Sequence, residues 1–162
     1  MGEILYKGDC LEIMQTLPSE SVDMIFADPP FNVGKKYGGK SNTDNRSDYY
    51  AWCSDWIAEG FRLLKPTGTF YLMTIPRHVF RMGSEMEKHG IFINKVEWRH
   101  SSAAGSKRAF WPSSQPIVVF GKTHLLDTEQ KWEAAFLLMF VTIVDLFGGY
   151  TFNIALSRRT MD

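Results

Sequence analysis

Short apolar runs and stretches of helical spacing alternate along most of this chain of 162 residues. Residues 22–27 form a β-prone run bounded by turn residues, which predicts a mostly buried strand of a parallel sheet. Similar runs predict further strands over residues 4–7, 69–74, 92–98, 116–122 and 140–145. Helical spacing predicts helices over residues 11–17, 49–63 and 77–89, around 132–139, and from Phe152 onward. This alternation predicts an α/β fold.

Two irregular, polar stretches interrupt the alternation, over residues 31–47 and 101–114. Structureless segments of this length in a compact domain are usually functional or disordered. The first stretch contains Lys35 and Lys36, and the second contains Lys107 and Arg108 just before a Phe-Trp pair. Cations beside aromatic rings suit nucleic-acid phosphates and bases, but a solvated loop can have the same composition. These four residues are therefore candidates for DNA contact, and the solvated-loop interpretation stays open.

The composition is that of a single globular domain, with 44% hydrophobic residues. Lys plus Arg and Asp plus Glu number 18 each, so binding to nucleic acid would need a local basic patch. Cys10 and Cys53 are too few for a zinc cluster, and the four histidines are scattered, so we expect no metal. The N-terminus lacks a secretion signal, and the longest apolar run is too short for a membrane span. We therefore expect a soluble, cytoplasmic protein with no membrane partner.

The sequence Asp28-Pro29-Pro30-Phe31 follows the apolar run 22–27 directly, which places a carboxylate at a strand's end. Ligands of parallel sheets bind outside the carboxyl ends of the strands. The two prolines fix φ and remove two backbone donors, so the Asp28 carboxylate and the Pro29 carbonyl become neighbouring acceptors. Such a pair beside an aromatic ring can hold the amino group of a flat nucleobase. The alternative is that Asp28 caps a turn and the prolines only end a strand.

Several motif fragments occur in one order along the chain. They are Gly8-Asp9-Cys10, Asp28-Pro29-Pro30-Phe31 with Asn32-Val33-Gly34, Leu64-Lys65-Pro66-Thr67-Gly68, Ile117-Val118-Val119-Phe120-Gly121-Lys122 and Asp145-Leu146-Phe147-Gly148-Gly149. This order resembles the beta class of DNA amino-methyltransferases, which methylate the exocyclic nitrogen of adenine or cytosine in DNA with S-adenosylmethionine. The resemblance implies a Rossmann-like methyltransferase sheet with helices on both faces.

The resemblance also implies roles for single residues. Asp28, Pro29 and Phe31 would hold the target base, while Asp9 and Cys10 would lie at the adenine end of the S-adenosylmethionine cofactor. Asp145, Phe147 and Gly149 would line its methionine end. An aspartate at position 28 resembles the adenine-specific branch, and we expect N6-adenine methylation of DNA. Cytosine-N4 methylation and a noncatalytic remnant that only binds nucleic acid are the alternatives.

The chain departs from the family pattern in three places. Bulky residues, Tyr150 to Phe152, follow the glycine turn. Little sequence separates residue 122 from the second motif, so we expect one domain (a catalytic half, 1–122, and a shortened cofactor half, 123–162) without a separate target-recognition domain. The family's next strand would begin after Asp162, so we expect a sheet that is incomplete at its C-terminal edge. Direct re-pairing of strands, a homodimer or a complementing subunit would fill that gap.

Overall fold

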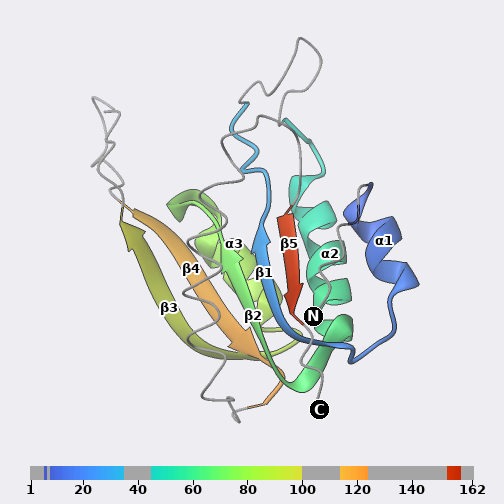
Figure 1. The fold of residues 1–162 in the computed structure, drawn as a ribbon. Helices are drawn as coiled ribbons and strands as arrows, with labels where there is room; N and C mark the ends of the chain where they lie inside the picture. The colour runs from blue at the N-terminus through green and yellow to red at the C-terminus, as the bar shows by residue number, and fades with distance from the viewer. Residues whose placement is uncertain (1–5, 7, 35–44, 100–113, 124–152, 158–162) are drawn as a thin grey trace, which may run out of the picture.

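The computed structural model describes residues 6, 8–34, 45–99, 114–123 and 153–157. In chain order the elements are α1 (Cys10–Thr16), β1 (Val22–Asp28), α2 (Tyr49–Leu63), β2 (Leu64–Met73), α3 (Pro76–Met86), β3 (Ile91–Arg99), β4 (Ser114–Gly121) and β5 (Asn153–Ser157). The strands form one sheet in the order β3-β4-β2-β1-β5 (Figure 1). β1 and β2 are parallel, and the other neighbours are antiparallel. The α/β class is confirmed. Residues 22–27 pair in parallel with β2, as expected, but in antiparallel with β5, so the sheet is mixed rather than parallel.

The helix expected from Phe152 onward is wrong, because residues 153–157 form strand β5. Each residue of β5 is paired with one of β1, from Asn153 opposite Asp28 to Ser157 opposite Met24. The backbone groups of a buried strand need partners on both sides, and β5 supplies them along this edge of β1. Ile154 and Leu156 alternate with smaller residues, so this short segment also fits the period of a strand. The local sequence pattern of residues 153–157 is compatible with both a helix and a strand. Pairing with β1 makes the segment a strand.

Strand β2 begins at Leu64, five residues earlier than the predicted strand. Val22 pairs with Leu64 but Met24 pairs with Thr69, so β2 contains an irregular step over residues Lys65–Gly68. Pro66 has no N–H to contribute there. Lys65 Nζ lies 2.8 and 2.9 Å from the two carboxylate oxygens of Asp23, which fastens the step to β1.

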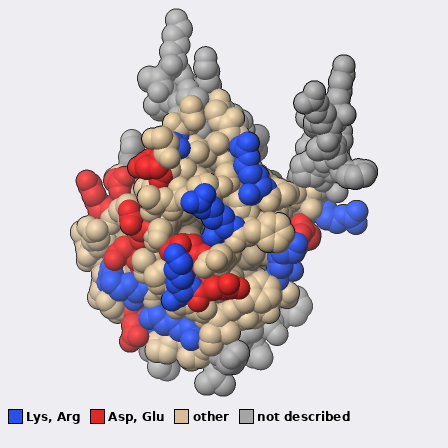
Figure 2. Space-filling view, turned by 180° about the vertical axis from the view of Figure 1, so that it is seen from behind, with Lys and Arg blue, Asp and Glu red and all other residues tan. Residues whose placement is uncertain are grey.

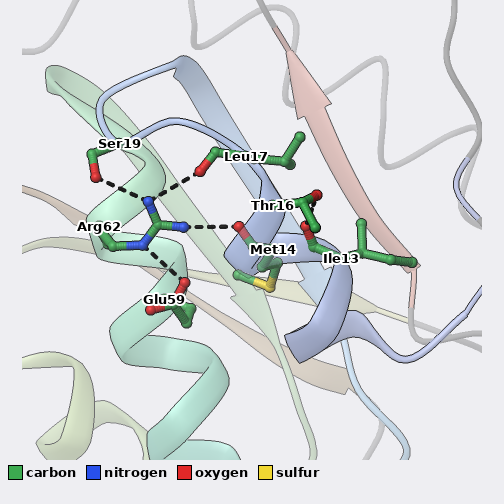
Figure 3. A network of polar contacts seen from close by, with 7 residues as sticks. All are labelled: Ile13, Met14, Thr16, Leu17, Ser19, Glu59 and Arg62. Carbon is green, nitrogen blue, oxygen red and sulfur yellow. Dashed lines mark hydrogen bonds and ion pairs between the residues drawn. The ribbon is translucent and has the colours of Figure 1, made fainter.

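Helix α1 begins as its sequence predicts and is fastened to α2 at its other end. Asp9 Oδ1 accepts from Leu11 N at 2.9 Å and Glu12 N at 3.3 Å, which caps the first turn. Figure 3 shows the guanidinium of Arg62, on α2, reaching the last turn of α1. It donates to the carbonyl oxygens of Met14 (2.8 Å) and Leu17 (3.1 Å). The Met14 carbonyl also accepts from Leu17 N at 3.1 Å, so Arg62 adds a second bond there and pairs the Leu17 carbonyl just beyond the helix.

The three described helices contribute to one hydrophobic cluster with one face of the sheet, and Figure 1 shows them on that side. Trp56, Phe61 and Phe70 lie in this cluster and are at most 3% exposed. The opposite face carries a second buried cluster. Its members are Met24, Phe26, Tyr71, Met73, Ile117 and Val119. The helix expected around residues 132–139 and the strands expected at 4–7 and 140–145 lie outside the described residues. None of the described helices has the length and apolar character that crossing a bilayer requires.

Candidate functional site

Asp28 is the last residue of β1, so its carboxylate lies at the carboxyl end of the parallel pair β1–β2. The residue is partly exposed, whereas its Oδ1 atom and the following Pro29 are buried. Pro30 and Phe31 are partly exposed, so a ligand can reach them. The structure therefore brings Asp28, Pro29 and Phe31 together at the edge of the sheet where parallel α/β folds bind ligands.

Asn32 closes the chain immediately after this tetrapeptide. Its φ of 51° lies in the left-handed region, which asparagine tolerates better than most residues. Its Oδ1 accepts from Arg46 N at 2.6 Å, and its Nδ2 donates to Arg46 O at 3.1 Å. The chain that leaves β1 is thus joined to the segment that starts α2.

His78, in the first turn of α3, fixes the same segment from the other side. The residue is only 3% exposed. Its Nε2 lies 2.8 Å from Phe31 O, and its Nδ1 lies 2.7 Å from the hydroxyl of Tyr50 on α2. A carbonyl oxygen can only accept, so Nε2 carries the proton and donates. In the neutral ring Nδ1 is then the acceptor, and the Tyr50 hydroxyl donates to it.

Burial keeps this imidazole neutral. Desolvation lowers the pKa of His78 below its usual value and outweighs the Phe31 hydrogen bond, which raises the pKa, while nearby Arg77 adds to the lowering. Aromatic rings surround the imidazole, with the centroid of Tyr49 5.1 Å and that of Tyr50 5.5 Å away. The Arg81 guanidinium lies 3.9 Å from the Tyr50 ring centroid, so it stacks on the ring of the tyrosine that contacts His78.

The sequence analysis considered the four histidines only as scattered residues without a metal and so missed this contact. The usable signal was its position. His78 follows β2 by a few residues, so it lies in a helix that starts at the same edge of the sheet as Asp28. Helix starts that follow the carboxyl ends of parallel strands are frequent sources of ligand-site residues.

Asp9 and Cys10 lie together at the N-terminus of α1. Asp9 is exposed, and the helix cap fixes the direction of its carboxylate. Burial, reinforced by the neighbouring Asp9 charge, raises the pKa of the Cys10 thiol to about 11. The thiol is therefore neutral near pH 7, which makes it a packing or hydrogen-bonding group rather than a nucleophile. Cys53 is buried in α2, and burial raises its pKa to about 12.

The other predicted site residues lie outside the described residues. They are the cofactor candidates Asp145, Phe147 and Gly149 and the DNA candidates Lys35, Lys36, Lys107 and Arg108. Along the chain, the segment that contains the glycine turn leads into β5, whose first residue, Asn153, is paired with Asp28. Figure 2 shows acidic and basic side chains interspersed over the face seen from behind, so the described surface in this view has no wide basic field.

Asp28 to Phe31 thus follow a buried strand of an α/β sheet, at the carboxyl end of its parallel pair. The sequence model described as DNA methylase, for N6 and N4 methyltransferases, matches residues 22–158. The chain therefore belongs to the N6/N4 DNA methylase family.

Two curated relatives support this assignment. "Type II methyltransferase M.BamHI" of Bacillus amyloliquefaciens is 47% identical over 45% of this chain and 18% of its own length. "DNA adenine methyltransferase YhdJ" of Escherichia coli (strain K12) is 31% identical over 75% of this chain and 42% of its own length. The chain thus spans less than half the length of these relatives.

Solved structures show the same fold. The PvuII DNA methyltransferase, described as cytosine-N4-specific, superposes with a TM-score of 0.58 at 20% identity, covering 75% of this chain and 50% of that one. The M1.HpyAVI–SAM complex superposes with a TM-score of 0.53 at 18% identity, covering 73% of this chain and 55% of that one. The methyltransferase-type α/β sheet expected from the sequence is confirmed at this level.

Proposed function

We propose that this protein transfers a methyl group from S-adenosylmethionine to the N6 amine of adenine in DNA. The observation that carries the proposal is the position of Asp28-Pro29-Pro30-Phe31 at the carboxyl end of β1, with Asp28 beside β5 and the Phe31 carbonyl held by His78. Membership of the N6/N4 DNA methylase family supports the reaction class.

The proposed chemistry depends on two hydrogen bonds to the amine. The lone pair of an exocyclic amine is delocalised into the base, so the free amine is a poor nucleophile. Acceptance of its two hydrogens by the Asp28 carboxylate and the Pro29 carbonyl would draw the nitrogen toward tetrahedral geometry and free the lone pair. No prior deprotonation is required. As the N–C bond forms, the S–C bond of the methyl donor would break, S-adenosylhomocysteine would leave, and the methylated nitrogen would then release a proton. Alignment of the amine with the methyl group would supply much of the rate enhancement.

Phe31 would hold the plane of the base by stacking. A base inside a duplex cannot reach this edge of the sheet, so the adenine would have to rotate out of the helix before reaction. Pro29 and Pro30 stiffen the segment, so the acceptors keep their positions while the base enters.

S-adenosylmethionine would supply an electrophilic methyl group on a sulfonium sulfur. Among the described residues, Asp9 fits one end of this cofactor, because its exposed, cap-oriented carboxylate can accept from hydroxyl or amino groups. Cys10 fits beside it as a neutral, partly buried side chain. We assign the other end to Asp145, Phe147 and Gly149. M1.HpyAVI, which has the same fold, was solved as a complex with SAM, and this supports the same cofactor here.

The choice of adenine rests on Asp28 itself, since the adenine-specific branch that the sequence resembles has an aspartate at this position. YhdJ carries the adenine name and the PvuII enzyme the cytosine-N4 name, so the two relatives point to different bases. We further assign DNA contacts to Lys35, Lys36, Lys107 and Arg108, and a cytoplasmic location, where DNA is available. The division into halves 1–122 and 123–162 and a homodimer or complementing subunit belong to the same proposal.

A labelled-methyl assay tests the proposal. Wild-type protein is incubated with unmethylated DNA and methyl-labelled S-adenosylmethionine, and the DNA is digested to nucleosides. We expect label in N6-methyl-2′-deoxyadenosine and none after Asp28→Ala, with the variant shown to be folded by circular dichroism. Label in N4-methyl-2′-deoxycytidine would overturn the choice of base. Salt-sensitive DNA binding without transfer or cofactor affinity would instead favour the noncatalytic alternative.

A further inference from the structure

Phe31 must be held in position if its ring is to stack on a base, and the family pattern assigns no residue to that task here. After β1 ends at Asp28, the segment 29–34 belongs to no helix or strand. A chain outside regular structure keeps one conformation only through contacts to its neighbours. Among the hydrogen bonds that the structure gives this segment, one anchors the Phe31 carbonyl and two anchor the Asn32 side chain.

The Phe31 anchor differs from a surface contact because the histidine that makes it is buried and both of its ring nitrogens are paired. His78 uses both ring nitrogens, at 2.8 Å to Phe31 O and 2.7 Å to the Tyr50 hydroxyl. His78 is only 3% exposed, so burial of the ring limits the access of water to both bonds. The Phe31 carbonyl requires the proton on Nε2, and donation from the Tyr50 hydroxyl to Nδ1 stabilises that tautomer.

We infer that His78 is the positioning residue of the base-binding segment, and that the Tyr50 hydroxyl stabilises the Nε2–H tautomer in which His78 holds the Phe31 carbonyl. This inference rests on the proposed function, because it deepens the role given to Phe31. The Tyr50–His78–Phe31 chain joins α2 and α3 to the exit of β1, so two helices of the core fix the side of the site on which the base stacks. The groups facing the imidazole are Tyr50 and Tyr49 from α2, the Phe31 carbonyl, and Arg77 from α3.

Replacement of His78 separates positioning from simple packing. His78→Gln can place an amide N–H near the position of Nε2, whereas His78→Phe keeps a ring but removes both polar atoms. His89→Gln is the matched control, because His89 lies beyond the other end of α3 and stacks on Phe61. Variants are compared at equal concentrations of folded protein.

Two measurements decide the inference. The first is the backbone order parameter of Phe31 and Asn32 from 15N relaxation, which needs no activity. We expect about 0.85 in wild type, His78→Gln and His89→Gln, and below about 0.6 in His78→Phe. The second is steady-state methyl transfer, where His78→Phe should lower kcat about 10- to 100-fold because Phe31 loses its alignment. The KM for DNA should change little, since phosphate contacts dominate affinity.

The ways in which the two proposals can fail are distinct. Unchanged order parameters in His78→Phe would overturn the inference whatever the activity, and so would an unchanged kcat in an active enzyme. Absence of transfer by the wild type would contradict the proposed function, while the order parameters would still decide whether His78 holds the segment. If His78→Phe does not fold, Tyr50→Phe carries the test, because it removes one hydroxyl and keeps the ring beneath Arg81. It should show both imidazole tautomers by 15N spectroscopy and a lower kcat, and a single Nε2–H tautomer with normal kcat would overturn the inference.

Discussion

His78 is a titratable group in an almost fully buried position, and this links the stability of the fold to pH. Its ring is neutral in the folded protein, because burial disfavours the charged form. Phe31 and Tyr50 together use both nitrogens of that neutral ring. The site segment is therefore held best at a pH where the imidazole carries no charge.

The pH dependence has a definite sign. The pKa of His78 is lowered in the folded state, so below its ordinary value near 6.5 the unfolded chain binds the proton more readily than the folded chain. The free energy of unfolding of wild type should fall as the pH drops through this range, with a slope of at most about 1.4 kcal/mol per pH unit from this group. Urea unfolding of wild type and His78→Gln from about pH 8 to pH 5 measures this difference. Parallel curves for the two proteins would contradict it.

Among the single residues of the site, the position of Asp28 could be predicted from the sequence, whereas the role of His78 could not. The end of an apolar run followed by two prolines locates a carboxylate at a strand's end without any tertiary information. The role of His78 depends on a contact with Phe31, 47 residues away, and no local pattern records such a contact. Asp9 is an intermediate case. Its capping hydrogen bonds are to residues two and three positions away, whereas its proposed contact with the cofactor depends on the tertiary fold.

Helix α2 is the element on which the described core depends, and Gly60 sets its distance from the sheet. A Cβ atom at Gly60 would lie 2.4 Å from Cε1 of Phe70 on β2, closer than real contacts allow. Gly60→Ala should therefore lower the free energy of unfolding by about 1 to 3 kcal/mol through overpacking. Gly83, in α3, is the control, because nothing lies within 4 Å of its added Cβ. Gly83→Ala should raise stability by up to about 1 kcal/mol, and equal effects at both glycines in urea unfolding would refute the packing argument.

The Arg62 contacts make a second prediction about elements. The guanidinium donates to two carbonyls at the end of α1, to Ser19 Oγ and to Glu59, which requires its fork of donors (Figure 3). Arg62→Lys keeps the charge but cannot reach all four acceptors, so the free energy of unfolding should fall by about 1 to 3 kcal/mol.

Lys88→Ala, which removes an exposed i,i+3 ion pair with Glu85, is the control for Arg62→Lys. It should change stability by less than about 0.5 kcal/mol. Denaturant unfolding of both variants distinguishes a helix anchor from an ordinary surface charge. Equal, small losses would show that α1 does not depend on Arg62.

Most helices and strands were predictable because their hydrophobic patterns are long and end at turn-forming or helix-terminating residues. Residues 49–63 and 22–27 are examples, and α1 begins within one residue of the helix predicted over 11–17. Two errors have a common cause, which is strand pairing. β5 forms because β1 needs a partner along its edge, and β2 begins early because Leu64 pairs with Val22 before the irregular step. Pairing partners lie far apart in sequence, so local periodicity cannot reveal them.

For the whole molecule, the strand order predicts which strands unfold locally most easily. β1 and β2 lie at the interior of the sheet and between two buried clusters, whereas β3 is an edge strand with exposed Phe92 and Val96. Amide hydrogen exchange of Ile25 to Ala27 and Phe70 to Leu72 should be the slowest among the described residues, and that of β3 clearly faster. Exchange from β1 that is as fast as exchange from β3 would contradict this sheet order.

The sequence predicted the α/β class and family resemblance but not the sheet's mixed arrangement. Antiparallel pairing of β3, β4 and β5 depends on how the chain returns after residues 99, 121 and 152, which no apolar pattern specifies. The resemblance implied helices on both faces of the sheet, whereas the three described helices all lie on one face. The two-half division of the chain stays a prediction.

The central claim is that the Asp28 carboxylate makes the target amine nucleophilic. Single-turnover methyl transfer to DNA tests it most directly, with wild type, Asp28→Asn and, as a control, Asp55→Asn at an exposed position on α2. Asparagine is nearly the same size as aspartate but removes the charge, so transfer should slow about 100- to 1,000-fold while Asp55→Asn matches wild type. A wild-type rate in folded Asp28→Asn would contradict the claim.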